Sequence, residues 1–264
     1  MYQAARHIAF DFSEARSVLR AIDAAIEELR GVGLRLSLHV IALVMALMMS
    51  GCGPQEDQMQ DHTGTTQDQI QDLSIHDQYE LAEQRYLELQ ELAGEVQSQI
   101  HDGDWAAPSV GSEINPRMGS SLGRAPEGAT KNNSYYFDVF RTYAPAEDED
   151  LHDIIRQTSD DWADRGWQIS IEKIDNRTFL NATTSDHYWF ELAENTHNDQ
   201  LHFRGHSPVY WVTDYMELGR ATQQRREAQN EAADEWPVAD QSSETRRLFQ
   251  PGEHRPFPAW EIID

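Results

Sequence analysis

The residues with the clearest potential for chemistry surround the only cysteine of the chain, Cys52. Arg30 and Arg35 precede an apolar run of about fourteen residues, which ends in Ser50 and Gly51 directly before this cysteine. A membrane-spanning helix needs roughly 20 apolar residues, so a permanent span is not expected. The h-region of a cleaved signal peptide, roughly 7–15 residues, fits this length. Small residues before the cysteine suit a peptidase that must grip an extended backbone.

The segment resembles the signal peptide and lipobox of bacterial lipoproteins, with Met49-Ser50-Gly51-Cys52 as the lipobox. The family usually has Leu where Met49 stands. The resemblance implies cleavage between Gly51 and Cys52, and a diacylglyceryl group on the Cys52 thiol. Two acyl chains anchor a protein stably, because each buried CH₂ contributes about 0.8 kcal/mol. This predicts a protein anchored to the extracytoplasmic face of the cell membrane; the alternative is a buried core helix with a free structural cysteine.

Residues 1–30 are longer than an ordinary n-region. Val18, Ile22, Ile26 and Leu29 fall at helical spacing, so this segment is able to form an amphipathic helix. A start codon assigned upstream of the true one explains the extra length, and a cytoplasmic extension is the alternative. In both cases residues 1–51 are excluded from the mature fold.

The composition is strongly acidic, with 46 acidic and 21 basic residues and a formal net charge of −25. Residues 1–51 hold five of each, so the whole excess belongs to the mature part. Nucleic acid is not expected as a partner, because phosphate binding requires a basic face. The same charge opposes contact of the polypeptide with anionic lipid. A single cysteine leaves no intramolecular disulfide.

The chain after residue 51 divides into three segments. Residues 52–73 form the lipidated cysteine and a Gln- and Asp-rich segment that predicts a disordered tether. Residues 74–212 predict an α+β domain, and residues 213–264 a polar, loosely ordered end. The domain begins with a long helix over 74–100, whose apolar residues alternate at spacings of four and three. That seam predicts packing within its own domain, with a coiled coil as the alternative.

The rest of the domain predicts the order β-α-β-β-β-β, a small antiparallel sheet with a helix on one face. A strand over 134–142 precedes a helix over 149–165, and four short strands follow to residue 206. Trp162 ends the apolar face of the helix, so we expect it to lie against inward strand residues such as Phe190 and Leu192. Trp189 is expected on the opposite, polar strand face.

Histidines form the only other cluster with potential for chemistry: His197, His202 and His206, near Asp199. His202 and His206 lie four residues apart on one strand, roughly 13 Å, which is too far for both to bind one metal ion. No nucleophile-elbow or zinc-protease motif is present in the sequence. The acids at 147–150 lack the spacing of a calcium loop. The sequence therefore predicts no catalytic residue, no metal site and no cofactor.

The lipobox, the polar tether and the small α+β domain together resemble the uncharacterised lipoproteins of high-GC Gram-positive bacteria, such as the LppA-like family. That family has no assigned activity to carry over. We expect a non-enzymatic binding or envelope-associated lipoprotein, joined to the membrane through Cys52 and with a possible, unidentified envelope protein as partner. An extracytoplasmic hydrolase or metal-dependent enzyme is the alternative.

Lipidation is tested by metabolic labelling with a palmitate analogue. We expect the label on the wild type and none on Cys52→Ser, because the thiol is the acylated group. Equal labelling of both would contradict the lipoprotein interpretation.

Overall fold

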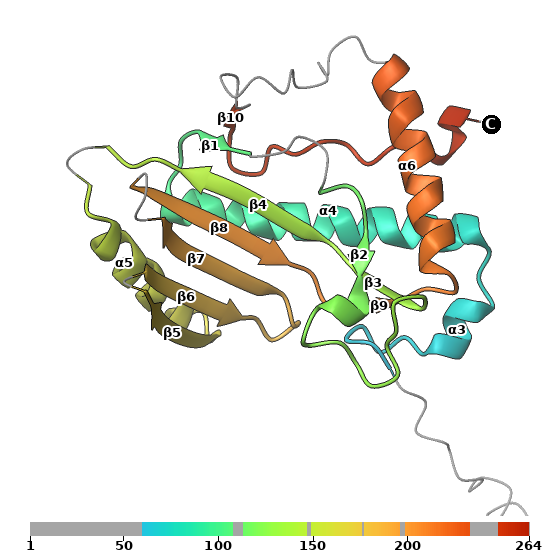
Figure 1. Ribbon diagram of the computed structural model, residues 1–264, viewed down its shortest axis with the longest axis horizontal. Coiled ribbons are helices and arrows are strands. Elements are labelled where there is room, and N and C mark those ends of the chain that lie inside the picture. The colour runs from blue at the N-terminus through green and yellow to red at the C-terminus, as the bar shows by residue number, and fades with distance from the viewer. Residues whose placement is uncertain are drawn as a thin grey trace, which may run out of the picture. The chain divides into compact units, whose positions relative to one another are not determined.

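Four helices and two antiparallel sheets make up the part of the chain that a computed structural model describes (Figure 1). The described residues are 60–107, 113–146, 149–175, 177–195, 199–232 and 248–263. All of them belong to one unit, Asp57–Asp264. The predicted signal peptide 1–51, its cleavage site at Gly51 and the lipidation site Cys52 lie outside the described residues. The predicted α+β class is confirmed.

The larger sheet has seven strands in the order β10-β1-β4-β8-β7-β6-β5, every neighbouring pair antiparallel. It is larger than the small sheet that the sequence predicts, because two-residue strands extend one edge. Its strands are β1 Trp105–Ala106, β4 Asp138–Tyr143, β5 Gln168–Ile174, β6 Arg177–Thr183, β7 Trp189–Asn195, β8 Gln200–His206 and β10 Leu248–Phe249. The smaller sheet has the order β2-β3-β9, with β2 Arg117–Met118, β3 Ser134–Tyr136 and β9 Tyr210–Trp211.

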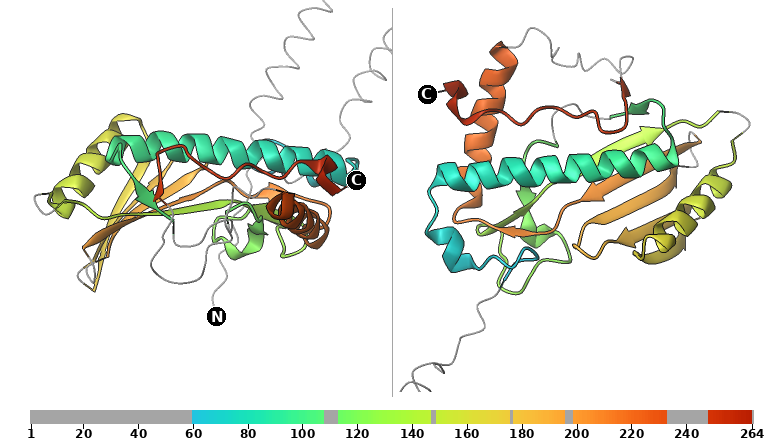
Figure 2. Two further views of the ribbon diagram at one scale, coloured as in Figure 1. Left: turned by 90° about the horizontal axis from the view of Figure 1, so that it is seen from above. Right: turned by 180° about the vertical axis from the view of Figure 1, so that it is seen from behind.

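Two helices cover one face of the larger sheet, α4 (Ile75–Ile100) and α5 (Leu151–Asp164) (Figure 2). Ser74 and Asp77 form a capping box at the start of α4, and Asp150 caps α5. Strand residues alternate in burial, as period-2 side chains require. One cluster joins both helices to the sheet and includes Val96, Ile155, Trp162, Leu180, Phe190, Leu192 and Phe203.

A second cluster lies around the N-terminal half of α4. Tyr79, Ala82, Tyr86 and Leu89 are all at most 1 % exposed there. They pack with residues of the small sheet, of α6 (Tyr215–Ala232) and of the C-terminal segment that ends in η2 (Trp260–Ile263). The apolar seam of α4 is therefore buried within its own unit along the length of the helix.

The structure differs from the predicted tether over 52–73, because its described part is ordered. Helix α3 (Gln67–Gln71) begins at a capping box formed by Thr66 and Gln69, and it buries Ile70. Asp61 is also buried, and its Oδ2 accepts a hydrogen bond from the Trp211 backbone N–H at 3.4 Å. The polar composition of this segment does not predict such contacts, because they join residues that are far apart in the sequence.

The described part of 213–264 is ordered too, which differs from the predicted loose end. Helix α6 buries Leu218, and β10 pairs with β1. The Tyr79 hydroxyl donates to the Pro258 carbonyl at 2.8 Å, and the Tyr86 hydroxyl donates to the Arg255 carbonyl at 2.7 Å. Buried tyrosines of α4 thus hold an irregular segment that has little apolar periodicity of its own.

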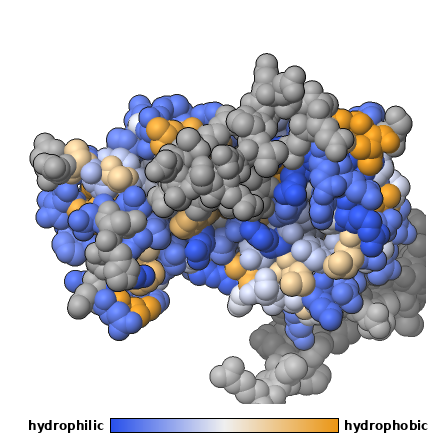
Figure 3. All heavy atoms as spheres, turned by 45° about the horizontal axis from the view of Figure 1, so that its top comes forward, coloured by the Kyte–Doolittle hydropathy of each residue, from blue (hydrophilic) through white to orange (hydrophobic). Residues whose placement is uncertain are grey.

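Most described residues on the face seen in Figure 3 are hydrophilic, and the apolar ones form small separate patches. This agrees with the acidic composition. No helix among the described residues is long and apolar enough to cross a membrane. The short 3₁₀ turn η1 (Gly119–Ser121) follows β2 and leads into the loop before β3.

The contact predicted for Trp162 is confirmed, because its ring lies 6.4 Å from that of Phe190 and it is fully buried. We expect Trp162→Ala to lower the free energy of unfolding by about 3–5 kcal/mol, since the lost transfer energy adds to a cavity. Ile174→Ala is the matched control: Ile174 is 51 % exposed, so we expect less than about 1 kcal/mol. Urea denaturation measures both. Similar losses for the two variants would contradict this assignment of the core.

Candidate functional site

The face of the larger sheet opposite α4 and α5 carries a row of polar and aromatic side chains. The register pairs Gln168 with Thr183, Thr183 with Trp189, and Trp189 with His206. These four residues therefore lie side by side across β5, β6, β7 and β8, all on one face. The sequence places Trp189 on this polar face, and the structure agrees.

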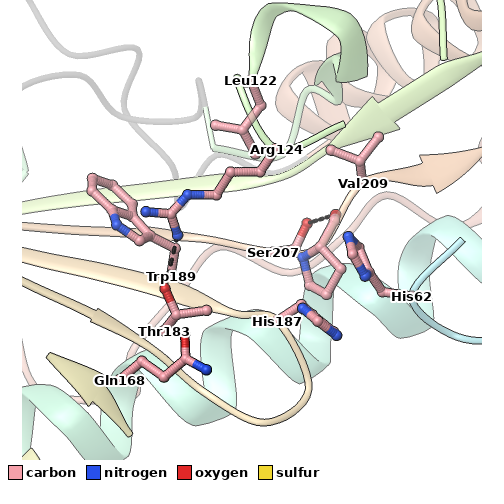
Figure 4. Close-up of a pocket in the computed structure, with 10 residues that line it drawn as sticks. His62, Leu122, Arg124, Gln168, Thr183, His187, Trp189, Ser207 and Val209 are labelled. Atoms are coloured by element: carbon pink, nitrogen blue, oxygen red, sulfur yellow. Dashed lines mark hydrogen bonds between the residues drawn. The ribbon is translucent and has the colours of Figure 1, made fainter. Parts of the chain in front are cut away.

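A cavity of about 360 Å³ lies beside this row, and Gln168, Thr183 and Trp189 line it (Figure 4). It forms where the strand ends meet the loop after η1 and the segment before α3. This volume falls in the range of small-molecule pockets, about 300–1,000 Å³. The lining residues come from five separate parts of the chain: His62, Leu122, Arg124, Gln168, Thr183, His187, Trp189, Ser207, Pro208 and Val209.

Arg124 places the only guanidinium of the cavity lining over the indole of Trp189, 5.1 Å from the ring centroid. Its Nη1 donates to the Thr183 hydroxyl at 3.0 Å. Desolvation lowers the pKa of Arg124 from its ordinary value. Among the described residues, no carboxylate lies within ion-pair distance of this guanidinium. Its remaining N–H groups are able to bind a further acceptor.

Two histidines stack on the other side of the cavity. The rings of His62 and His187 lie 4.0 Å apart with an interplanar angle of 27°. Burial lowers the pKa of His62, and the charge of His187 lowers it further; a backbone hydrogen bond to Arg124 and the carboxylate of Asp61 act in the opposite direction. The stack therefore favours the neutral form of His62.

Turns hold both histidines in place. The Asp61 Oδ1 accepts hydrogen bonds from the Thr63 and Thr65 backbone N–H groups, and this turn presents His62. His187 adopts a left-handed backbone with φ of 65°, in a turn where its N–H donates to the Thr184 carbonyl at 3.1 Å. A left-handed residue other than glycine is uncommon, and such strain clusters at functional sites.

His206 lies between two aromatic rings next to the cavity. Its ring is 4.8 Å from that of Trp189 and 5.3 Å from that of Tyr136. Desolvation lowers its pKa to about 4, so it is neutral at pH 7. Neither His206 Nδ1 nor Trp189 Nε1 has a hydrogen-bond partner among the described residues, although both atoms are buried. The side chain of His206 is therefore half-buried between these rings.

Ser207 is the only serine that lines the cavity, and its hydroxyl is already engaged. Its Oγ accepts from the Phe137 N–H at 2.9 Å and donates to the Pro208 carbonyl at 2.8 Å. A serine nucleophile requires a base within hydrogen-bond reach, and here the proton is directed to a carbonyl instead. The arrangement provides donors and an aromatic wall, which suit binding.

The histidine cluster considered from the sequence is not assembled around this cavity. His197 lies outside the described residues, and His202 contacts Asn195 through Nε2 at 3.1 Å on the same sheet face. Within the described ranges, no group of three or more His, Cys, Asp or Glu residues is placed to hold a metal ion.

Sequence reasoning missed Arg124, His62 and His187 as site residues. His62 falls in the predicted tether, and Arg124 falls between the predicted helix over 74–100 and the predicted strand over 134–142, where no element is expected. The pattern Thr66-x-x-Gln69 before Ile70 is a capping-box signal that could have shown that the chain is ordered from this region onward.

Comparison with protein-family models, with curated proteins and with solved structures gives no match for this chain.

The low pKa of His206 predicts a pH-dependent stability. The unfolded state takes up a proton below pH 6.5, whereas the folded state does so only near pH 4. Stability present above pH 6.5 is therefore lost as the pH falls toward 4, by on the order of 3 kcal/mol from this residue. We expect His206→Gln to lose less stability than the wild type between pH 7 and pH 4, measured by urea denaturation. An identical pH dependence for the two proteins would contradict this.

Proposed function

We propose that this protein is a non-enzymatic binding lipoprotein, held at the extracytoplasmic face of the cell membrane by a diacylglyceryl group on Cys52. The domain over 60–263 captures a small ligand in the cavity between Arg124, Trp189 and the two stacked histidines. The observation that carries the binding role is the cavity itself, in which donors from separate segments converge around an aromatic wall.

The order of arginines, apolar run, small residues and cysteine supports the anchor. The ordered domain begins soon after the anchoring position, because Asp61 is already buried. Nine residue steps separate Cys52 from Asp61, and they span at most roughly 32 Å when fully extended. A lipid on Cys52 would therefore keep the domain close to the membrane surface.

The non-enzymatic role is supported by the way the polar groups of the cavity are used. Ser207 donates its proton to a backbone carbonyl, and no acidic residue lines the cavity. The stacked histidines are not paired with a nucleophile in the lining. A hydrolase, which would turn its ligand over, is the alternative.

Native mass spectrometry of the full chain, extracted from its own membranes in neutral detergent, tests the binding role. We expect a small-molecule adduct on the wild type, absent from Trp189→Ala because the aromatic wall is lost. Trp260→Ala is the matched control: this tryptophan packs on Arg225, 3.5 Å from its ring centroid, and does not line the cavity.

The released compound decides between the two classes of function. A compound that stays chemically unchanged on renewed incubation supports binding, whereas its turnover by the wild type would favour the hydrolase. A wild type without any adduct, or an adduct that survives Trp189→Ala, would contradict a binding role for this cavity.

A further inference from the structure

We propose that the cavity binds an oxyanion group, carboxylate or phosphate, of a small organic ligand, with Arg124 as the principal contact. This deepens the binding role and rests on it. The cavity lining holds one arginine and two histidines and no acidic residue, in a chain with 46 acidic side chains. No lining carboxylate therefore competes with a ligand for the donors of Arg124, which leaves them able to bind an anionic group.

The position of Arg124 leaves its donors available. The guanidinium lies over the Trp189 indole, 5.1 Å from the ring centroid, and a cation–π contact of this kind does not use the N–H donors. One of them reaches Thr183 at 3.0 Å, which fixes the rotation of the side chain. The fork geometry of the other donors matches two oxygens of a carboxylate or phosphate. Trp189 and Thr183 therefore position this arginine for bidentate recognition.

The stacked histidines supply the second contact. Figure 4 shows His62 and His187 together on the side of the cavity away from Trp189. A neutral imidazole carries one N–H donor. That of His62 is engaged by the backbone of Arg124, so the donor toward a ligand comes from His187. An oxyanion between Arg124 and this pair would receive donors from two sides, which a single surface arginine cannot provide.

The rest of the cavity indicates an organic body on the ligand. The cavity of about 360 Å³ has the volume of roughly twelve waters at about 30 Å³ each. An isolated carboxylate or phosphate group would fill only a part of this space. Leu122 and Val209 also line the cavity and offer apolar surface to such a ligand. The ligand is therefore expected to join an oxyanion to an uncharged or apolar part.

Two sources can supply this chemistry. If Cys52 carries the lipid, ten residue steps keep His62 within roughly 36 Å of the membrane surface. A phospholipid headgroup and a dissolved organic acid or phosphate are then both within reach. The shared feature is the oxyanion, and the probes below separate the sources.

Isothermal titration of the full chain in neutral detergent uses three probes: inorganic phosphate, benzoate and glycerophosphoglycerol, the headgroup part of an anionic phospholipid. We expect at least one of them to bind the wild type. Glycerol and benzyl alcohol serve as uncharged analogues and should not bind measurably. The tightest probe identifies the source: glycerophosphoglycerol indicates a headgroup, benzoate an organic acid, and phosphate a dissolved phosphate.

Arg124→Ala should weaken that probe by roughly ten- to hundred-fold, the range of a charge-assisted hydrogen bond. Arg220→Ala is the matched control, because it removes the same charge from an exposed position on α6 and should leave affinity unchanged. Arg124 is exposed, so its variants should keep the fold. Arg124→Lys should fall between the wild type and Arg124→Ala, since an ammonium group lacks the fork.

The oxyanion proposal is overturned if no probe binds the wild type, or if Arg124→Ala and Arg220→Ala have the same affinity. Its failure is distinguishable from failure of the proposed function. A membrane-derived adduct that is uncharged and depends on Trp189 would leave the binding role standing and remove the oxyanion. Loss of labelling at Cys52 would remove the anchor and leave the titration unaffected.

Discussion

One helix, buried on one face along its length, is the constraint on which the rest of the structure depends. Helix α4 contributes Tyr79, Tyr86 and Leu89 to one hydrophobic cluster and Val96 to the other. The C-terminal segment passes so close to it that a Cβ on Gly94 would lie 2.4 Å from the Cα of Gly252. Because both clusters share this helix, the two sheets and the C-terminal segment are held as one unit.

The site depends on that unit although none of its lining residues belongs to α4. Asp61 is held at Trp211 and lies 3.8 Å from the buried Arg85 of α4, measured between Oδ2 and Nη2. The turn that follows Asp61 presents His62 to His187. The strand that carries Trp189 is held on its opposite face, because the ring of the next residue, Phe190, packs on that of Trp167 with 5.6 Å between the centroids. Rigid elements therefore support a candidate site whose lining residues lie mostly on loops.

Much of the fold follows from local patterns, whereas the site follows from contacts between distant segments. Alternation places Trp189 on the polar face, and the apolar spacing of α5 places Trp162 in the core. The order of the described parts of 60–73 and 213–263 depends instead on single buried groups, such as Asp61 and the Pro258 carbonyl that accepts from Tyr79. Arg124 and His62 lie in polar stretches without periodicity, and only the folded chain brings them together.

The charge of the molecule adds the last constraint on the site. A net charge of −25 repels anions at distances beyond the pocket, so a dissolved anion approaches this protein against its field. At physiological ionic strength that field decays over about 8 Å. Selection of an anion would then depend on direct contacts in the cavity and not on long-range electrostatic attraction. If the predicted anchor is present, its short connection to the domain would keep the site near ligands that are concentrated at the membrane.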